Sequence, residues 1–172
     1  HNRIKTLINE PYALNSINSS ILTQKIISNL YDGIKTSEID NYSANLCASL
    51  SIENIEYNEL AGRIVVSNNH KNTIKSFSEK STILYNRQLN GKHCPILADD
   101  YYNYVKKNKD EIEKMIDYNK DYDFDFFGFR TLEKGYLLKV NDKVIERPQD
   151  LYMRVAIFIH MTAKSLNNVP NS

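Results

Sequence analysis

The sequence has little of what defines several common classes of protein. Its 172 residues include only two cysteines, Cys47 and Cys94, which lie far apart and have no CxxC partner. This spacing argues against a disulfide framework and against a cysteine-based zinc module. The longest apolar run, residues 155–159, is too short to span a bilayer. Because no signal-peptide pattern opens the sequence, we expect a cytoplasmic protein.

The sequence also lacks an excess of charge of one sign. The net charge is +1, and charged residues make up 25% of the chain. No long run of Lys and Arg is present, so neither a nucleic acid nor an anionic membrane surface is an expected partner. A chain of this length forms one domain or two small ones and is long enough to bury a core.

The first 72 residues predict a small bundle of short helices. Apolar residues recur on one face of residues 19–30, which predicts a helix. Ser19 or Ser20 is expected to cap its start, and Gly33 is expected to end it in the left-handed conformation. Thr36 is expected to cap a second helix that runs to residue 50. A third helix is expected from about residue 54 to 71, with an apolar stripe of its own.

The remainder predicts further helices and one β-hairpin. Residues 73–85 suit a linking helix, and Asn90-Gly91 marks the best candidate for a domain boundary. Asn141-Asp142 suits a two-residue hairpin turn between two short strands. The other expected segments are helices at 97–106, 109–117 and 123–132, strands at 136–140 and 143–147, and a last helix from Pro148 with Leu151, Tyr152, Val155 and Phe158 facing inward. The predicted fold class is mainly α.

Thr36, Asp40 and Lys71 form the candidate site. Thr36 begins a helix, where free N–H groups and the helix dipole favour a phosphate, and Asp40 lies one turn later on the same face. The Asp40 carboxylate suits a ribose hydroxyl or a metal carried by a nucleotide, and Lys71 suits phosphate oxygens. The plain alternative is that Thr36 is only an N-cap, Asp40 complements the dipole, and Lys71 is a solvated helix end.

Other chemically suggestive residues have simpler explanations. His70 and His93 lack further ligands at metal-binding spacing, so we expect no metal site and expect His70 to cap or pack against its helix. The acidic cluster of Asp117, Asp121, Asp123 and Asp125 lacks the pattern of an EF-hand loop and suits a solvated loop and helix start. Cys47 suits a core position. The aromatic residues at 122–129 suit a core, and Arg130 and Arg154 suit buried pairing with Glu133 and Glu146.

Two separate stretches resemble one family in both order and spacing. Residues 127–133 (FGFRTLE), 136–138 (YLL) and 146–149 (ERPQ) resemble the N-terminal region of the large subunit of class I ribonucleotide reductase. Residues 31–33 (YDG), 36–40, 63–68 (RIVVSN) and 70–71 are similar to the later helices of the ATP-cone, the allosteric domain of that family.

The resemblance implies a division of the chain and a regulatory role. It implies a partial ATP-cone at 1–72, a linking helix and loop at 73–92, the N-terminal helical domain of the reductase large subunit at 93–160, and an unmatched tail at 161–172. In the ATP-cone, residues at the positions of Thr36, Asp40 and Lys71 contact ATP or dATP as allosteric effector. The opening hairpin of the cone is expected to be missing, so unaided binding is expected to be weak or absent.

The resemblance also implies chemistry that this chain does not perform alone. The family reduces ribonucleoside diphosphates to deoxyribonucleotides for DNA replication, using a thiyl radical and a cysteine pair in a barrel expected beyond this sequence. We therefore expect no catalytic residue and no bound metal here. The implied partners are the remainder of the large subunit, the small radical-bearing subunit and further copies of the parent. A non-catalytic nucleotide-sensing or assembly module that docks onto a separate catalytic half is the alternative.

Overall fold

The computed structural model describes residues 2–31 and 33–167, with the side chains at 36, 37 and 165–167 excepted. The described chain is mainly helical and forms two compact units. One contains the described residues up to Asn72 together with Asn119–Gly135, and the other contains Thr73–Tyr118 together with the described residues from Tyr136 onward. The predicted class is confirmed, although two hairpins are present where one was expected.

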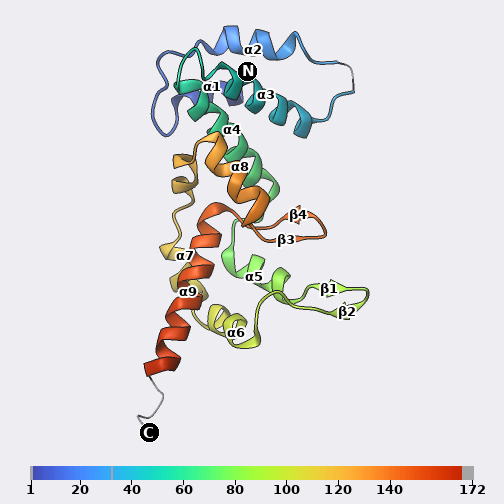
Figure 1. Cartoon of the computed structure of the whole chain (residues 1–172), viewed down its shortest axis with the longest axis vertical. Helices are drawn as coiled ribbons and strands as arrows, with labels where there is room; N and C mark the ends of the chain where they lie inside the picture. The colour runs from blue at the N-terminus through green and yellow to red at the C-terminus, as the bar shows by residue number, and fades with distance from the viewer. Residues whose placement is uncertain (1, 32, 168–172) are drawn as a thin grey trace. The chain divides into compact units, whose positions relative to one another are not determined.

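The first unit is a bundle around the longest of its helices, α4 (Figure 1). A five-residue loop joins α3 to α4, so these two helices pack as an αα-hairpin, and α8 lies along α4. Its helices are α1 (Asn2–Asn9), α2 (Ser19–Ile27), α3 (Thr36–Leu50), α4 (Glu56–Asn72) and α8 (Phe126–Gly135).

The core of the first unit is apolar and tightly packed. Phe129 of α8 is fully buried, whereas Phe127 is largely exposed, so the predicted aromatic core is right except at that position. Gly62 explains how close the chain before α8 comes to α4. A Cβ atom at Gly62 would lie 2.3 Å from the carbonyl oxygen of Phe124, which excludes any larger residue without a backbone shift. The core consists of Leu7, Ile8, Leu14, Ile17, Leu22, Ile26, Ala44, Cys47, Leu60, Ala61, Ile64, Val65, Val66 and Phe129.

Two helix ends differ from the expectation in this unit. Asn18, and neither serine, caps α2, because its side-chain oxygen accepts hydrogen bonds from the backbone N–H groups of Ser20 and Ile21. The helix ends at Ile27, so Gly33, although it has a φ of 86°, lies beyond the helix end that it was expected to form. Glycine adopts positive φ in turns as well as at helix ends, so Gly33 alone did not locate the end of α2.

The second unit combines four helices with two hairpins (Figure 1). Both hairpins turn through residues with positive φ: Asn90 and Gly91 in the first, Asn141 and Asp142 in the second. The predicted turn at 141–142 is confirmed, and the Asn-Gly pair read as a boundary is also a hairpin turn. The elements are α5 (Phe77–Tyr85), β1 (Gln88–Leu89), β2 (Lys92–His93), α6 (Asp99–Lys107), α7 (Lys109–Met115), β3 (Lys139–Val140), β4 (Lys143–Val144) and α9 (Pro148–Asn167). A 3-10 helix at Tyr118–Asp123 lies between α7 and α8 in the sequence, and all of it except Tyr118 belongs to the first unit.

The inward face predicted for α9 is wrong at three of its four residues. Tyr152, Val155 and Phe158 are 50%, 43% and 63% exposed, and among the described side chains of the helix Ile157 is the buried apolar one. Periodic apolar spacing shows that a face is apolar but does not show what covers it. The core of this unit consists of Phe77, Leu84, Leu97, Tyr101, Val105, Ile112 and Ile157.

Candidate functional site

Asp40 is buried in the second turn of α3 and is paired with Arg3 of α1. Arg3 Nη1 lies 2.5 Å from Asp40 Oδ1, and Arg3 Nη2 donates to Ser67 Oγ of α4 at 3.1 Å. Asp40 is only 9% exposed. Its second carboxylate oxygen, Oδ2, has no hydrogen-bond partner among the described residues. A carboxylate has about four acceptor positions, so this buried group retains capacity for a donor.

The antiparallel packing of α3 and α4 places Asp40 and Lys71 at the same end of the helix pair. The contacts of Arg3 are consistent with this arrangement, because its guanidinium bonds both to Asp40 near the start of α3 and to Ser67 near the end of α4. Lys71 is exposed and follows Ser67 by four residues, which is about one helical turn or about 6 Å along the axis. Two of the three predicted site residues, Asp40 and Lys71, therefore lie at one end of the α3–α4 pair.

Thr36 begins α3 but is not its N-cap. Lys35, with an extended backbone, occupies the cap position and makes no side-chain capping bond, because a lysine side chain has no acceptor. The first helical bonds run from the N–H groups of Glu38 and Ile39 to the Lys35 carbonyl. The predicted cap at Thr36 is therefore wrong, and its side chain lies outside the described residues. The start of α3 presents backbone N–H groups that no side chain of Lys35 caps.

A buried arginine fixes the helix that presents Arg3. Arg63 of α4 is 1% exposed, and its Nη1 donates to the carbonyl oxygens of Leu7, Glu10 and Tyr12 at 2.8–2.9 Å. Its guanidinium also lies 4.3 Å from the ring centroid of Tyr12. A cation at a helix C-terminus satisfies carbonyl groups that the helix leaves open. The position of α1, and so of Arg3, is set by α4.

A groove of about 580 Å³ adjoins this ion pair within the first unit. Arg3 and Ser67 line it together with Thr6, Glu10 and Tyr122. The volume is within the range of about 300–1,000 Å³ typical of ligand sites. Sequence reasoning missed Arg3 and the groove, because their residues come from three distant segments and share no motif.

His70 and Asp121 form a second polar contact in this unit. His70 Nε2 lies 2.6 Å from Asp121 Oδ2, and Asp121 is completely buried. The expectation of a solvated acidic loop is wrong for Asp121, and His70 pairs with the 3-10 helix where packing on its own helix was expected. The ring of Tyr122 packs edge-on against His70 at 5.4 Å. This contact ties the end of α4 to the segment that leads into α8.

The second unit contains a buried ionic cluster. Lys80 of α5 pairs with Asp150 of α9, and both side chains are at most 2% exposed. Asp150 also accepts from the Tyr118 hydroxyl and the Arg147 N–H, each at 2.6 Å. Burial lowers the pKa of Lys80 and raises the pKa of Asp150, in each case against the attraction of its partner. The void beside the pair measures about 10 Å³, roughly the size that one water needs, so the cluster has no room for a substrate.

Cys47 is not placed to act as a nucleophile. Cys47 is fully buried in the first core, as predicted, and burial raises the pKa of its thiol to about 12. A thiolate is the reactive form, so Cys47 is inert near neutral pH. Among the described residues, no group of three or more His, Cys, Asp or Glu side chains is placed to hold a metal ion.

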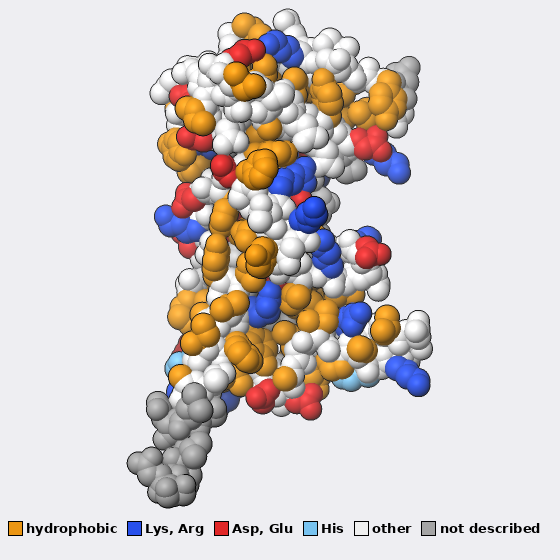
Figure 2. All heavy atoms as spheres, viewed as in Figure 1, with side chains coloured by type: hydrophobic (Ala, Val, Ile, Leu, Met, Phe, Trp, Pro, Cys, Tyr) orange, Lys and Arg blue, Asp and Glu red, His pale blue; other side chains and the backbone are white. Residues whose placement is uncertain are grey.

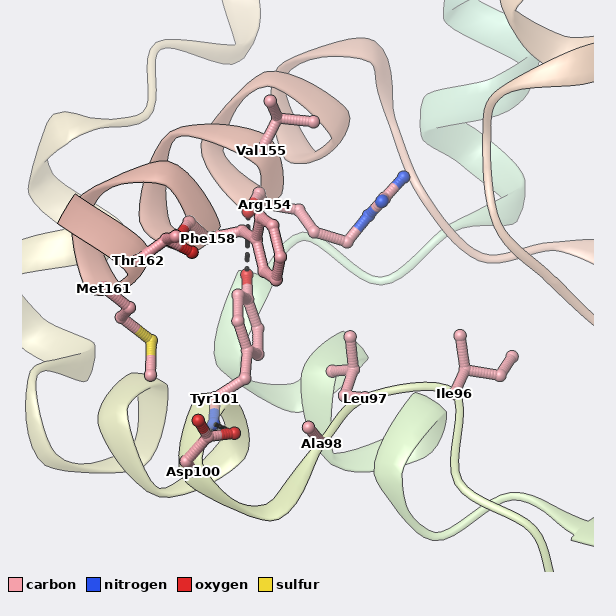
Figure 3. A pocket seen from close by; sticks show the side chains of 10 residues that line it. All are labelled: Ile96, Leu97, Ala98, Asp100, Tyr101, Arg154, Val155, Phe158, Met161 and Thr162. Atoms are coloured by element: carbon pink, nitrogen blue, oxygen red, sulfur yellow. Dashed lines mark hydrogen bonds between the residues drawn. The ribbon is translucent and has the colours of Figure 1, made fainter. Parts of the chain in front are cut away.

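The exposed apolar face of α9 borders a groove of about 660 Å³ in the second unit. Figure 3 shows Val155, Phe158 and Met161 of α9 across from Leu97 and Tyr101. The Tyr101 hydroxyl donates to the Arg154 carbonyl at 3.5 Å, which links the two walls. Hydrophobic side chains are visible along α9 in the space-filling view (Figure 2).

The pairs predicted for Arg130 and Arg154 are both present. Arg154 Nε lies 2.7 Å from Glu146 Oε1, and that carboxylate is buried. Arg130 Nη1 lies 2.6 Å from Glu133 Oε2, but both of these side chains are about one-third exposed. The prediction of a buried pair is therefore right for Arg154 and wrong for Arg130.

Comparison with known proteins relates this chain to one enzyme family. The family described as "Ribonucleotide reductase, all-alpha domain" matches residues 122–169. The chain is 45% identical over 148 residues to the ribonucleoside-diphosphate reductase large chain 2 of Saccharomyces cerevisiae. This match covers 85% of the chain and 17% of the yeast protein. It is 46% identical over 138 residues to the large subunit of Caenorhabditis elegans (79% and 18%) and 43% identical over 153 residues to that of Variola virus (87% and 20%).

Over these residues the chain belongs to the ribonucleotide reductase large-subunit family.

The chain spans about a fifth of the length of the reductase large subunits that it matches. The matched stretch of the all-alpha reductase domain includes α8, the second hairpin and α9. The FGFRTLE segment lies in α8, YLL lies between α8 and β3, and ERPQ runs into the start of α9. The family recognised from those segments is confirmed. No helix in the described part of the chain is both long and apolar enough to cross a membrane.

Proposed function

We propose that this chain is the regulatory and scaffold portion of a ribonucleoside-diphosphate reductase large subunit. Its first unit binds ATP or dATP as an allosteric effector at Asp40, Lys71 and the Thr36 helix start. The observation that carries this assignment is the buried Asp40 carboxylate, whose Oδ2 atom has no partner among the described residues. In this proposal residues 1–72 are the later part of an ATP-cone, and residues 93–160 belong to the N-terminal helical domain.

The chemistry of a nucleotide matches the groups at this end of the α3–α4 pair. A phosphate is an anion, which backbone N–H groups at a helix start and a lysine ammonium both favour. The side chain of Lys35, the N-cap residue of α3, makes no capping hydrogen bond, and Lys71 is exposed at the adjacent end of α4. A ribose hydroxyl is a donor, which is what the free oxygen of Asp40 accepts.

Two charged groups in the groove argue for a ligand with both donors and acceptors. Arg3 supplies donors and Glu10 supplies acceptors, while Tyr122 supplies an aromatic face. A nucleotide has a phosphate, hydroxyl groups and a flat base, so it uses all three kinds of contact. A purely apolar ligand would leave the Asp40–Arg3 pair unused.

We assign no catalytic residue to the described chain. Reduction of a ribonucleotide by this family needs a cysteine-centred radical and a reducing cysteine pair, and the buried thiol of Cys47 is unsuited to either role. The enzymatic activity is therefore proposed for the parent subunit, which would supply deoxyribonucleotides for DNA replication in the cytoplasm. Its partners in this proposal are the small radical-bearing subunit and further copies of the large subunit.

The exposed apolar face of α9 supports the scaffold role. Val155, Phe158 and Ile159 are each at least 43% exposed on one helix, beside an open groove. Large contiguous apolar patches on a protein surface mark interaction sites. We assign this face to the contact with the remainder of the large subunit.

The effector assignment is tested by nucleotide titration of the intact large subunit that carries this sequence. Asp40→Asn keeps the shape of the side chain but makes it a weaker acceptor, and we expect dATP affinity to fall by about tenfold, the effect of about 1.4 kcal/mol. Asp123→Asn removes an exposed carboxylate of the same unit and serves as control. Equal dATP affinity in Asp40→Asn and wild type, measured by calorimetry, would remove Asp40 from the site.

The scaffold assignment is tested by complementation. The 172-residue chain is mixed with a polypeptide that carries the rest of the large subunit, and the small subunit is added. Recovery of ribonucleoside-diphosphate reduction supports the split of roles proposed above. Stable association without recovery favours the alternative, a non-catalytic nucleotide-sensing or assembly module, and failure to associate contradicts the scaffold role.

A further inference from the structure

We propose that Arg3 is a positioning residue of the effector site, which holds the Asp40 carboxylate by one oxygen and so presents the other to a ribose hydroxyl. This inference rests on the proposed function and extends it to a residue outside the predicted set. No sequence motif includes Arg3, so the inference depends on the contacts of this side chain alone.

The geometry of the pair is one-sided. Arg3 Nη1 contacts only Oδ1 of Asp40, at 2.5 Å, while Nη2 turns to Ser67 Oγ at 3.1 Å. An arginine that faces a carboxylate with its fork occupies both oxygens at once. Here Ser67 takes the second nitrogen, and Asp40 Oδ2 therefore has no partner among the described residues. Ser67 thus decides how much of the carboxylate Arg3 uses.

The pair also fixes the direction of the carboxylate. An aspartate side chain rotates about two bonds, and a single hydrogen bond from a ligand would have to order both. Arg3 has already done so, because it is anchored to α4 through Ser67 and its own helix is anchored through Arg63. A ligand then meets a carboxylate that is oriented before it binds, which lowers the cost of binding.

Lysine cannot replace Arg3 in this role. Its single ammonium is a compact charge without a planar fork, and it cannot hold Asp40 and Ser67 in two fixed directions. Arg3→Lys therefore keeps the positive charge that balances Asp40 but no longer fixes the orientation of the Asp40 carboxylate. Ser67→Ala keeps the arginine and frees its second nitrogen to turn toward Asp40 Oδ2.

The experiment compares dATP with 2′,3′-dideoxyATP, which lacks the ribose hydroxyl, on the intact large subunit. In wild type we expect dATP to bind about tenfold more tightly than the dideoxy form. In Arg3→Gln and Arg3→Lys we expect this ratio to fall to about twofold or less, since the hydroxyl no longer meets an oriented acceptor. Ser67→Ala should lower the ratio as well, because Oδ2 becomes engaged.

Lys5→Gln is the matched control. Lys5 lies on the same helix, two residues from Arg3, and is exposed, so its loss removes the same charge without touching Asp40. It should keep the wild-type ratio while it lowers the affinity for both nucleotides equally or not at all.

Three outcomes decide the matter. Loss of the ratio in Arg3→Lys, with the fold intact by circular dichroism, supports the positioning role. A wild-type ratio in both Arg3→Lys and Ser67→Ala overturns it and leaves the effector site standing. If wild type binds neither nucleotide, the proposed effector site itself fails and the role of Arg3 fails with it.

Discussion

Removal of the Lys80 ammonium group tests how strongly the buried ionic cluster stabilises the second unit. In Lys80→Met, Asp150 loses its cation but keeps the Tyr118 hydroxyl and the Arg147 N–H as donors at 2.6 Å. Loss of one partner of a buried ion pair costs about 3–5 kcal/mol when the other charge is left alone. Because two donors remain, we expect the free energy of unfolding to fall by about 3 kcal/mol, the lower end of that range.

The cost should depend on pH, with a sign that the structure sets. Burial raises the pKa of Asp150, and in Lys80→Met the opposing attraction of Lys80 is gone. Between the ordinary pKa and the raised one, the folded state holds a proton that the unfolded state has lost. Folding then binds protons, so the stability of the variant falls as pH rises through that window. The deficit relative to wild type should be smaller at acidic pH than at neutral pH.

Urea unfolding, followed by far-UV circular dichroism, measures the effect. With a slope of about 2 kcal/mol per molar urea, a loss of 3 kcal/mol moves the midpoint by about 1.5 M. Hydrogen exchange in α5 and α9 assigns the change to the second unit. Glu133→Gln breaks the Arg130–Glu133 pair, whose side chains are about one-third exposed, and should cost at most about 1 kcal/mol. If both variants move the midpoint equally, the buried cluster does not stabilise the unit as argued.

Two further changes test the packing and the pH response. Gly62→Ala places a methyl group 2.3 Å from the Phe124 carbonyl oxygen and should lower stability by about 1–3 kcal/mol in a thermal melt, whereas Gly135→Ala, which meets nothing within 4 Å, should be harmless. Burial alone would raise the pKa of Glu113, but hydrogen bonds from Ser78 and Ser76 outweigh it and lower the pKa. The stability contributed by Glu113 should therefore be present above its ordinary pKa and be lost as pH falls through the lowered one. Acid titration of Glu113→Gln should show a weaker loss than wild type, and an unchanged acid profile would contradict this.

A hairpin turn could be predicted from the sequence only where the flanking residues also had the pattern of β-strands. Asn141-Asp142 was expected to form a hairpin, and both residues have positive φ. Asn90-Gly91 has the same conformation, with φ of 52° and 73°, yet it was read as a break. The first hairpin has strands of two residues each, both exposed, so no apolar alternation marks it.

The candidate site could be predicted only in part, because residues far apart in the sequence form it. Asp40 and Lys71 follow from the resemblance because each lies in a recognisable segment. Arg3 contacts Asp40 across 37 residues and Ser67 across 64. Helix periodicity describes one element at a time and cannot indicate which side chains of two elements meet.

Buried charged side chains indicate which segments pack together, which helix periodicity does not. Arg63 and Lys80 are each 1% exposed and occupy helix positions where an apolar residue would satisfy the pattern equally well. Arg63 binds carbonyl groups at Leu7, Glu10 and Tyr12, and Lys80 binds Asp150, 70 residues away. An apolar side chain accepts many neighbours, but a buried cation is tolerated only beside its own acceptors. We infer that these two residues select which segments pack together, so Arg63→Met should lose hydrogen-exchange protection in α1 before it loses protection in α4, and simultaneous loss in both helices would contradict this role.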